Sequence, residues 1–205
     1  MELSPELRPI IEEARHSPLA VRMRDGLAKK MKTEGEVRPA DMVPVMAPDK
    51  NGRRKSFPMV WGFTFSGLNR PVVNARSETA DSKPAFRESF RRRRCIIPAA
   101  HYYEWDHIRI GNRVKAGTRY TIQPRGMTST WLAGLYRMET SPQGLLYPVF
   151  TILTREPSEE LRRIHDRMPV ILATETIPSW LDLSMSTAAL KGIIENSLTD
   201  MVIEK

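Results

Sequence analysis

Short apolar runs separated by turn residues recur through the middle of this chain, and they constrain its fold more than any other feature. The segment Asp49-Lys50-Asn51-Gly52 lies between two such runs, and an Asn-Gly pair in this position is typical of a β-hairpin. The runs are rich in β-branched and aromatic residues, which favour strands. We expect strands near Asn74 and over residues 43–47, 57–63, 94–99, 102–105, 119–123, 130–136 and 146–153.

Helical patterns lie mainly toward the two ends of the chain. Ser4-Pro5 predicts a helix start, because serine is a good N-cap and proline fits the first turn. We expect further helices over residues 79–90 (interrupted early by Pro84), after Ser158, over 177–181 and after Ser186, with a loop over 25–40 and a surface hairpin or insertion over 108–113. Many short strands with marginal helices predict one α+β domain over residues 1–205, built on a curled, mainly antiparallel, barrel-like sheet.

The charge balance favours a polyanionic partner without requiring one. The chain has 205 residues, with 32 Lys and Arg against 24 Asp and Glu, which gives a net charge of +8 and a pI near 9.9. Such a surface attracts nucleic acid, although a basic protein without that role has the same composition. The densest run, Arg91–Arg94, fits either a solvated face or a grip on a phosphate backbone.

Cysteine and histidine usage argues against disulfides and metals. The only cysteine, Cys95, lies in an apolar run, so we expect a buried thiol, and it allows neither an internal disulfide nor a cysteine-based zinc site. The four histidines show no ligand spacing, and we expect no metal and no cofactor. No apolar run approaches the roughly 20 residues of a membrane span. We therefore expect a cytoplasmic protein without a membrane partner.

Three polar motifs next to predicted strands point to one active site. His165-Asp166-Arg167 directly precedes the apolar run 168–172, which predicts a buried strand. Asn74-Ala75-Arg76 and Glu104-Trp105 lie in two other strand contexts. An imidazole, an amide, a carboxylate and guanidinium groups are suited to proton transfer and to binding an anionic substrate. We expect these motifs to converge.

The same motifs resemble the SOS-response-associated peptidase family, whose members are abasic-site processing proteins. The resemblance covers most of the chain from about Arg38 to Leu181 and implies a curled antiparallel sheet with flanking helices. It rests on blocks that occur in the family's order: Trp61–Phe63, Asn74–Thr79, Lys83–Arg87, Arg94–Ala99, Tyr103–Trp105, Ala133–Tyr136, Phe150–Thr154 and His165–Leu172.

The resemblance implies binding of single-stranded DNA and capture of the ring-opened aldehyde of an abasic site. In the family the capturing residue is a cysteine directly after the initiator methionine, which is removed. The cysteine amine and thiol then close a thiazolidine ring on the sugar. This sequence departs from that pattern, because Glu2 follows Met1. Either the cysteine-bearing strand lies upstream of this numbering, which we expect, or the cysteine is lost. As numbered, the chain cannot form the crosslink.

The resemblance also assigns roles to individual residues. Asn74 is expected to orient the terminal amine or the sugar, Glu104 to transfer protons at the deoxyribose, and His165 to protonate the sugar oxygen as the ring opens. Each has a plainer alternative: a strand-end amide, a surface carboxylate on an aromatic strand, and a histidine that caps the preceding helix.

The DNA contacts implied by the resemblance are more numerous and less specific. Arginines are expected at phosphates, tryptophans against bases, and two threonines, taken to lie on one strand face, at the backbone. The alternatives are solvent-exposed ion pairs with Asp166 or Glu78 for the arginines and core packing for the tryptophans. The residues are Arg38, Trp61, Arg76, Trp105, Thr151, Thr154 and Arg167.

Three functions remain open from the sequence. The first is a monomeric DNA-damage enzyme of the SOS response that acts on abasic sites in single-stranded DNA, associates with the nucleoid on damage and removes its own initiator methionine. The second is a non-catalytic module that binds single-stranded DNA and has lost the capturing residue. The third is a peptidase for external peptides, although the sequence shows no nucleophile–base pair suited to it.

Overall fold

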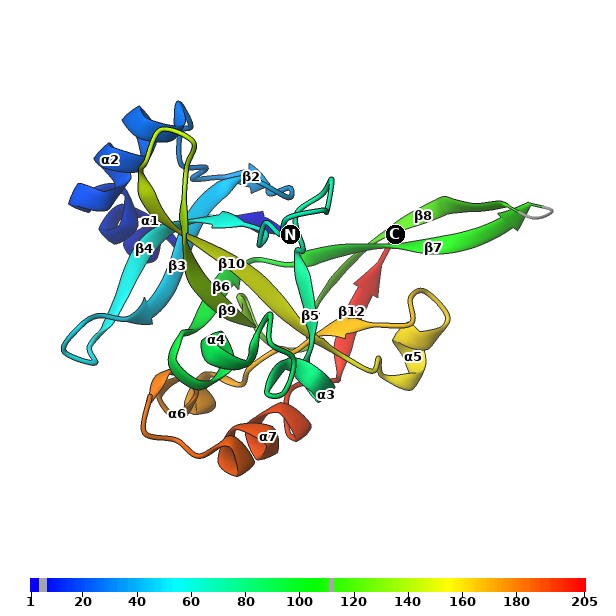
Figure 1. The fold of residues 1–205 in the computed structure, drawn as a ribbon. Coiled ribbons are helices and arrows are strands. Elements are labelled where there is room, and N and C mark those ends of the chain that lie inside the picture. The colour runs from blue at the N-terminus through cyan, green and yellow to red at the C-terminus, as the bar shows by residue number, and fades with distance from the viewer. Residues whose placement is uncertain (4–6, 111–112) are drawn as a thin grey trace.

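The computed structural model describes residues 1–3, 7–110 and 113–205. The expected helix start at Ser4-Pro5 and the tip of the expected hairpin at 111–112 lie outside these ranges. The described residues form an α+β domain built around a curled sheet with helices on its flanks (Figure 1). The predicted fold class is therefore confirmed.

Five strands close into a ring. In order around it, β10 pairs with β4, β4 with β3, β3 with β6, β6 with β9, and β9 again with β10. The pairs are antiparallel except β10–β4, which is parallel. Closure removes the exposed edges that an open sheet would leave. The strands are β3 (Met42–Pro48), β4 (Arg54–Trp61), β6 (Arg94–Ala99), β9 (Thr130–Thr140) and β10 (Leu146–Arg155).

Two short strands extend the ring at the C-terminal end of β10. The strand β5 (Asn74–Arg76) runs parallel to β10, and β11 (Met168–Pro169) runs antiparallel to it. The expected strand over 168–172 is thus only two residues long, although residues 170–172 are buried and Ile171 forms an isolated bridge to Leu132. This arrangement brings motifs from distant parts of the sequence to one end of β10.

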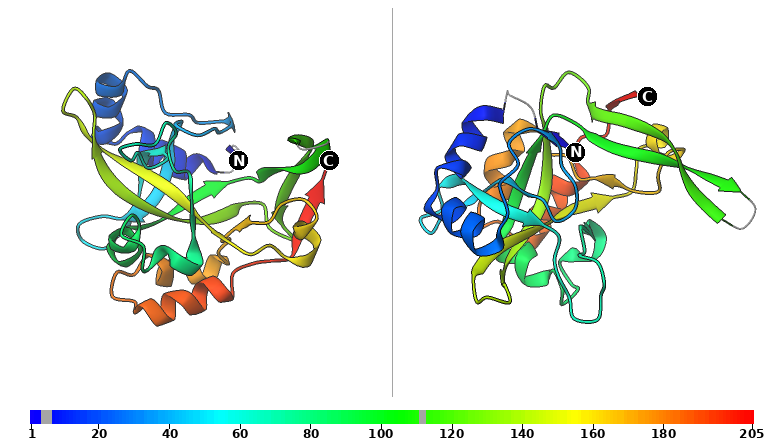
Figure 2. Two further views of the ribbon diagram at one scale, coloured as in Figure 1. Left: turned by 45° about the vertical axis from the view of Figure 1, so that its right-hand side comes forward. Right: turned by 90° about the horizontal axis from the view of Figure 1, so that it is seen from above.

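Two smaller sheets lie beside the ring. A hairpin of β7 (Tyr102–Ile110) and β8 (Arg113–Pro124) projects from the barrel, and β12 (Met201–Glu204) pairs with β8 (Figures 1 and 2). The strand β1 (Glu2–Leu3) pairs with β2 (Gly35–Glu36). The sequence pattern indicated neither β12 nor the β1–β2 pair, because such short strands carry no periodic signal.

The helices lie on two sides of the barrel (Figure 1). α1 packs on β3 and β4 and α2 on β4, whereas α4 packs on β6 and β9 and α6 on β6. The expected helix over 79–90 is two short helices, because Pro84 interrupts it, and α2 occupies residues that were expected to be partly loop. The helices are α1 (Arg8–Arg15), α2 (Pro18–Leu27), α3 (Ser77–Ala80), α4 (Arg87–Arg92), α5 (Glu159–Arg162), the 3-10 helix η2 (Thr174–Thr176), α6 (Ile177–Leu181) and α7 (Thr187–Glu195).

Both faces of the central strands are buried. Along β3, Val43 and Val45 join one core cluster, while Met42 and Met46 join a second cluster with residues of α6 and α7. Successive side chains of a strand point to opposite faces. A strand covered on both faces is therefore apolar throughout, and this explains why residues 42–48 form a continuous apolar run.

Candidate active site

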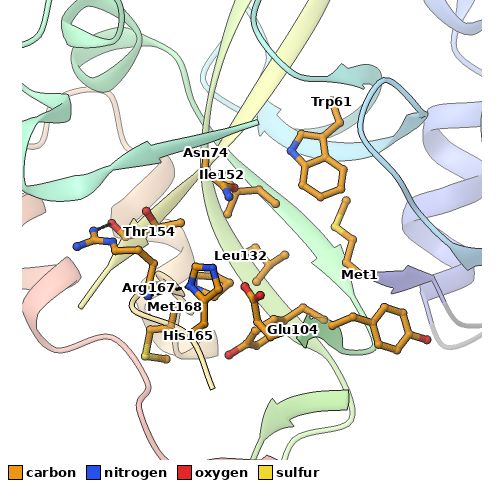
Figure 3. A pocket seen from close by; sticks show the side chains of 13 residues that line it. Met1, Trp61, Asn74, Glu104, Leu132, Ile152, Thr154, His165, Arg167 and Met168 are labelled. Atoms are coloured by element: carbon orange, nitrogen blue, oxygen red, sulfur yellow. Dashed lines mark hydrogen bonds between the residues drawn. The ribbon is translucent and has the colours of Figure 1, made fainter. Parts of the chain in front are cut away.

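One pocket collects the three residues predicted to be catalytic. Asn74 of β5, Glu104 of β7 and His165 of the α5–β11 loop all line a cavity of about 210 Å³ (Figure 3). Trp61, Thr154 and Arg167, expected at the DNA, also line it. The remaining lining residues are Met1, Tyr102, Tyr103, Leu132, Ile152, Met168 and Pro169.

The strand β10 decides which side chains reach the pocket. Ile152 pairs with Asn74 and Thr154 with Arg76, so residues 152 and 154 share the pocket face. Thr151 is three positions from Thr154 and must point to the opposite face. It is fully buried, and its hydroxyl has no hydrogen-bond partner within the described ranges. The expectation that both threonines lie on one strand face is wrong, and Thr151 is not placed to contact a phosphate.

A local turn fixes the ring of His165. The backbone N–H of Arg167 donates a hydrogen bond to Nδ1 of His165 at 3.0 Å. Because Nδ1 accepts this bond, the proton of the neutral ring lies on Nε2. The ring is partly buried. It lines the pocket, while the backbone N–H of His165 donates to the carbonyl of Leu161 in α5 at 3.0 Å, so the residue also contacts the end of that helix.

Arg167 is held by two partners at the pocket wall. Its guanidinium donates to the carboxylate of Glu78 at 2.8 Å and to the carbonyl of Thr154 at 2.7 Å. Burial tends to raise the pKa of Glu78, but the hydrogen bond and the charge of Arg167 outweigh it and lower the pKa. The Nε of Arg167 is buried and has no hydrogen-bond partner among the described residues. The predicted ion pair with Glu78 is therefore present, and one donor of Arg167 is unused.

The first residue of this numbering lies in the pocket. Met1 is held there because Val37 N–H donates to its carbonyl at 2.8 Å, while Glu2 N–H donates to the carbonyl of His101 at 3.0 Å. Burial lowers the pKa of the Met1 α-amine to about 6, although the charge of Glu36 acts in the opposite direction. An amine at this position is mostly neutral at pH 7 and therefore nucleophilic. The expectation that a cysteine-bearing strand precedes this numbering stays a prediction.

The two tryptophans lie in different environments. Trp61 stacks on Phe150 with 6.1 Å between ring centroids, and its Nε1–H donates to the carbonyl of Val73. It thus combines core packing with a place at the pocket. Trp105 is 38% exposed and does not line the pocket, and the guanidinium of Arg119 lies 5.8 Å from its ring centroid.

Two of the predicted arginines lie outside the pocket lining. Arg38 is exposed and forms an ion pair with Glu36 at 3.2 Å. Arg76 is also exposed, at the end of β5. Both arginines can contact a bound DNA strand only if that DNA extends beyond the cavity.

The arginine run 91–94 divides into exposed and buried members. Arg91 and Arg92 are exposed, whereas Arg94 is fully buried. Arg94 donates to the carbonyls of four residues that end α4 and α6: Phe90, Arg91, Trp180 and Asp182. It joins two helix ends and cannot bind a phosphate. The neighbouring Cys95 is buried, as expected, and burial raises the pKa of its thiol well above the usual range.

The described residues add neither a metal centre nor a membrane-spanning helix to the site. No group of three or more His, Cys, Asp or Glu within them is arranged to hold a metal ion. None of the helices in that part of the chain has the length and apolar character needed to cross a membrane.

The pocket includes tyrosines that sequence reasoning did not assign. Tyr103 lies beneath the guanidinium of Arg119, at 3.5 Å from the ring centroid, and its hydroxyl donates to the carboxylate of Glu2. Tyr102 is 4% exposed. Both tyrosines directly precede Glu104 in the sequence, and this closeness to a predicted site residue was the signal that could have found them.

The family model for SOS response associated peptidase (SRAP) matches residues 10–204. The chain belongs to this family. Among curated proteins it is 42% identical over 113 residues to Abasic site processing protein YoaM of Bacillus subtilis, covering 54% of this chain and 47% of that one. It is 28% identical over 190 residues to Abasic site processing protein HMCES of Xenopus tropicalis, covering 78% and 56%. The chain thus spans about half the length of these curated relatives.

Solved structures agree on the fold of this SRAP family member. A protein from Bacteroides thetaiotaomicron superposes with a TM-score of 0.70 at 22% identity, covering 96% of this chain and 86% of that one. A protein from Bordetella bronchiseptica gives a TM-score of 0.68 at 22% identity, covering 90% and 93%. At this identity the likeness concerns the fold alone.

Proposed function

We propose that this chain binds single-stranded DNA and processes abasic sites in the response to DNA damage. The observation that carries the proposal is the convergence of Asn74, Glu104 and His165 in one pocket. Family membership and the names of the relatives support it. The net charge of +8 suits a polyanionic strand.

The pocket chemistry suits capture of an aldehyde by an amine. Nε2–H of the neutral His165 ring donates a hydrogen bond to the sugar oxygen as the ring opens. A neutral amine then attacks the aldehyde carbon, and loss of water leaves an imine, with Glu104 moving the protons and Asn74 orienting the amine or the sugar. Where a cysteine carries the amine, its thiol adds to the imine carbon and closes a thiazolidine. The lowered pKa of the amine at Met1 supports this route, since only the neutral form attacks.

The DNA contacts follow from the residues around the pocket. Arg167 and Thr154 are proposed to contact the phosphate next to the lesion, and Arg76 and Arg38 to contact phosphates further along the strand. Trp61 and Trp105 are proposed to stack against bases. Such stacking does not depend on the DNA sequence, because every base has a π-face. The protein acts as a monomer near the nucleoid, and peptidase activity is limited to removal of its own initiator methionine.

A crosslinking assay tests the proposal. A fluorescent single strand with one abasic site is incubated with protein extended upstream to begin with Met-Cys, and covalent adduct is measured on a denaturing gel. We expect an adduct that requires the lesion and the added cysteine and survives Cys95→Ser, since Cys95 is buried. Absence of adduct with the extended protein would exclude covalent processing.

The alternative is a module that only binds single-stranded DNA. It is favoured by one observation: the only cysteine of this numbering, Cys95, is buried and cannot capture a sugar. Equal affinity for intact and abasic strands, with no adduct from any form of the protein, would establish this alternative.

A further inference from the structure

Tyr102 places an unused hydroxyl at the pocket. It begins β7, is 4% exposed and lines the same cavity as Asn74, Glu104 and His165. Its ring packs in the core cluster that contains Leu132 and Met168, which also line the cavity. Its hydroxyl is buried and has no hydrogen-bond partner in the part of the chain that the structure describes.

Burying this hydroxyl without a partner lowers the stability of the folded protein. A buried hydroxyl without a partner loses its hydrogen bonds to water and gains none in return. Phenylalanine would fill the same volume without that loss. The adjacent Tyr103 shows the contrast, because its hydroxyl donates to Glu2 and lies 2.9 Å from Nε2 of His101. An unpartnered buried polar atom in a native protein calls for an explanation, and a role at a binding or catalytic site is one.

The electrostatics of the position limit what the hydroxyl can bind. Burial, together with the charge of Glu104, raises the pKa of Tyr102 far above its ordinary value, so the hydroxyl keeps its proton and acts as a donor. The same carboxylate repels a phosphate from this part of the cavity. At the abasic nucleotide, which has no base, the acceptors that remain are the uncharged oxygens of the sugar.

We propose that the Tyr102 hydroxyl donates a hydrogen bond to an uncharged oxygen of the ring-opened abasic deoxyribose. The contact selects the open sugar over a closed ring that lacks its free hydroxyl groups. This assignment rests on the proposed function, since it names a substrate contact within the same pocket. No bond is made or broken by Tyr102 itself, which acts as a specificity residue.

Binding measurements on the chain as numbered here test the contact without any crosslinking. Fluorescence anisotropy compares three single strands: intact, with a tetrahydrofuran site, and with a borohydride-reduced abasic site, which is open and carries the hydroxyl groups. We expect the wild type to bind the reduced site about 3–10-fold more tightly than tetrahydrofuran, the range for one neutral hydrogen bond. In Tyr102→Phe this ratio falls to about 1, while affinity for the intact strand is unchanged.

Two controls separate the contact from a structural effect. Tyr120→Phe removes a hydroxyl that lies 3.4 Å from Asp106 on the β7–β8 hairpin, and it should preserve the ratio. Denaturant unfolding should show no loss of stability in Tyr102→Phe and a measurable loss in Tyr103→Phe, whose hydroxyl is partnered. If Tyr102→Phe lost as much unfolding free energy as Tyr103→Phe, the Tyr102 hydroxyl would have a hydrogen-bond partner within the protein. That result would overturn the proposal.

The remaining outcomes distinguish this inference from the proposed function. If the wild type binds the strands without preferring the reduced site, or if Tyr102→Phe keeps the preference, only the Tyr102 assignment fails. If the wild type binds none of the strands, the proposed function fails, and the assignment fails with it.

Discussion

The backbone N–H of Arg167 points at Nδ1 of His165 and donates a hydrogen bond to it at 3.0 Å. This short turn ties the orientation of the pocket imidazole to the residue that forms the pocket wall. The carboxylate of Asp166 also lies 3.1 Å from Nδ1, but its side chain is 81% exposed and free to turn into solvent. We therefore take the Arg167 bond as the one that sets the tautomer, with the proton on Nε2.

Replacing His165 by asparagine should remove the Nε2–H hydrogen-bond donor without disturbing the fold. The amide oxygen of His165→Asn can still accept the Arg167 N–H, but no donor remains at the place of Nε2. We expect adduct formation by the cysteine-extended protein to slow about 100-fold or more, the usual scale for losing a group that assists proton transfer, with DNA affinity unchanged. His16→Asn, at an exposed position, is the matched control. A rate within about threefold of wild type would remove His165 from the mechanism.

Removing Glu78 should strengthen DNA binding by releasing Arg167. In Glu78→Gln the guanidinium loses its 2.8 Å ion pair and becomes available to a phosphate. We expect affinity for single-stranded DNA to rise several-fold and the salt dependence to steepen by up to about 0.7, the value for one phosphate on a single strand. Anisotropy titrations at several salt concentrations measure both. Glu88→Gln makes the same charge change on α4, and an equal gain there would show a general charge effect instead.

Arg94 should be a determinant of stability and not of binding. Arg94→Met removes donors from the carbonyls that end α4 and α6, and we expect a loss of about 3 kcal/mol in the free energy of unfolding. Arg92→Met, at an exposed position, should change it by less than about 0.5 kcal/mol. Denaturant unfolding measures both variants. Similar stability of the two proteins would contradict the structural role.

The buried amine of Met1 should make stability depend on pH. Its pKa is about 6 in the folded protein and near 8 for an unfolded chain, so the unfolded state holds more protons between these values. The free energy of unfolding should therefore rise from pH 6 to pH 8, by up to about 3 kcal/mol, and lose this contribution below pH 6. Unfolding of protein with an N-acetylated Met1 should lack this dependence. Identical pH profiles for the two forms would refute the lowered pKa.

Two glycines should respond to alanine in opposite directions. A Cβ at Gly134 would lie 2.4 Å from Cδ1 of Ile97 and 3.0 Å from the carbonyl of Thr151, whereas a Cβ at Gly192 in α7 meets nothing within 4 Å. We expect Gly134→Ala to destabilise the barrel by about 1–3 kcal/mol and Gly192→Ala to stabilise the protein by about 0.5–1 kcal/mol. Thermal or denaturant unfolding measures the sign of the stability change in each variant. A tolerated Gly134→Ala would mean that the Ile97 side chain can move away at little cost.

Local sequence signals predicted some elements of the fold and missed others. The Asn-Gly turn after β3 formed where its residues indicated, with Gly52 at φ +75 and the Asp49 carboxylate accepting N–H bonds from Asn51 and Arg53. The helix α2 was not predicted, although Ser17 caps it through a bond from Ala20 N–H and Pro18 begins it. These capping residues precede a segment with many polar residues and weak helical periodicity, so the sequence pattern alone did not indicate the helix.

The sequence by itself determined the short strands, the α+β class and the side chains that a proton-transferring pocket requires, because these follow from residue type and from spacing along a few positions. Only the tertiary structure decided that β10 pairs with both β4 and β9, that β5 places Asn74 beside Ile152, and that Thr151 points away from the pocket that Thr154 lines. It also decided that Arg94 is buried while Arg91 is exposed. Strand partners and burial depend on contacts between residues far apart in the chain, which no local pattern records.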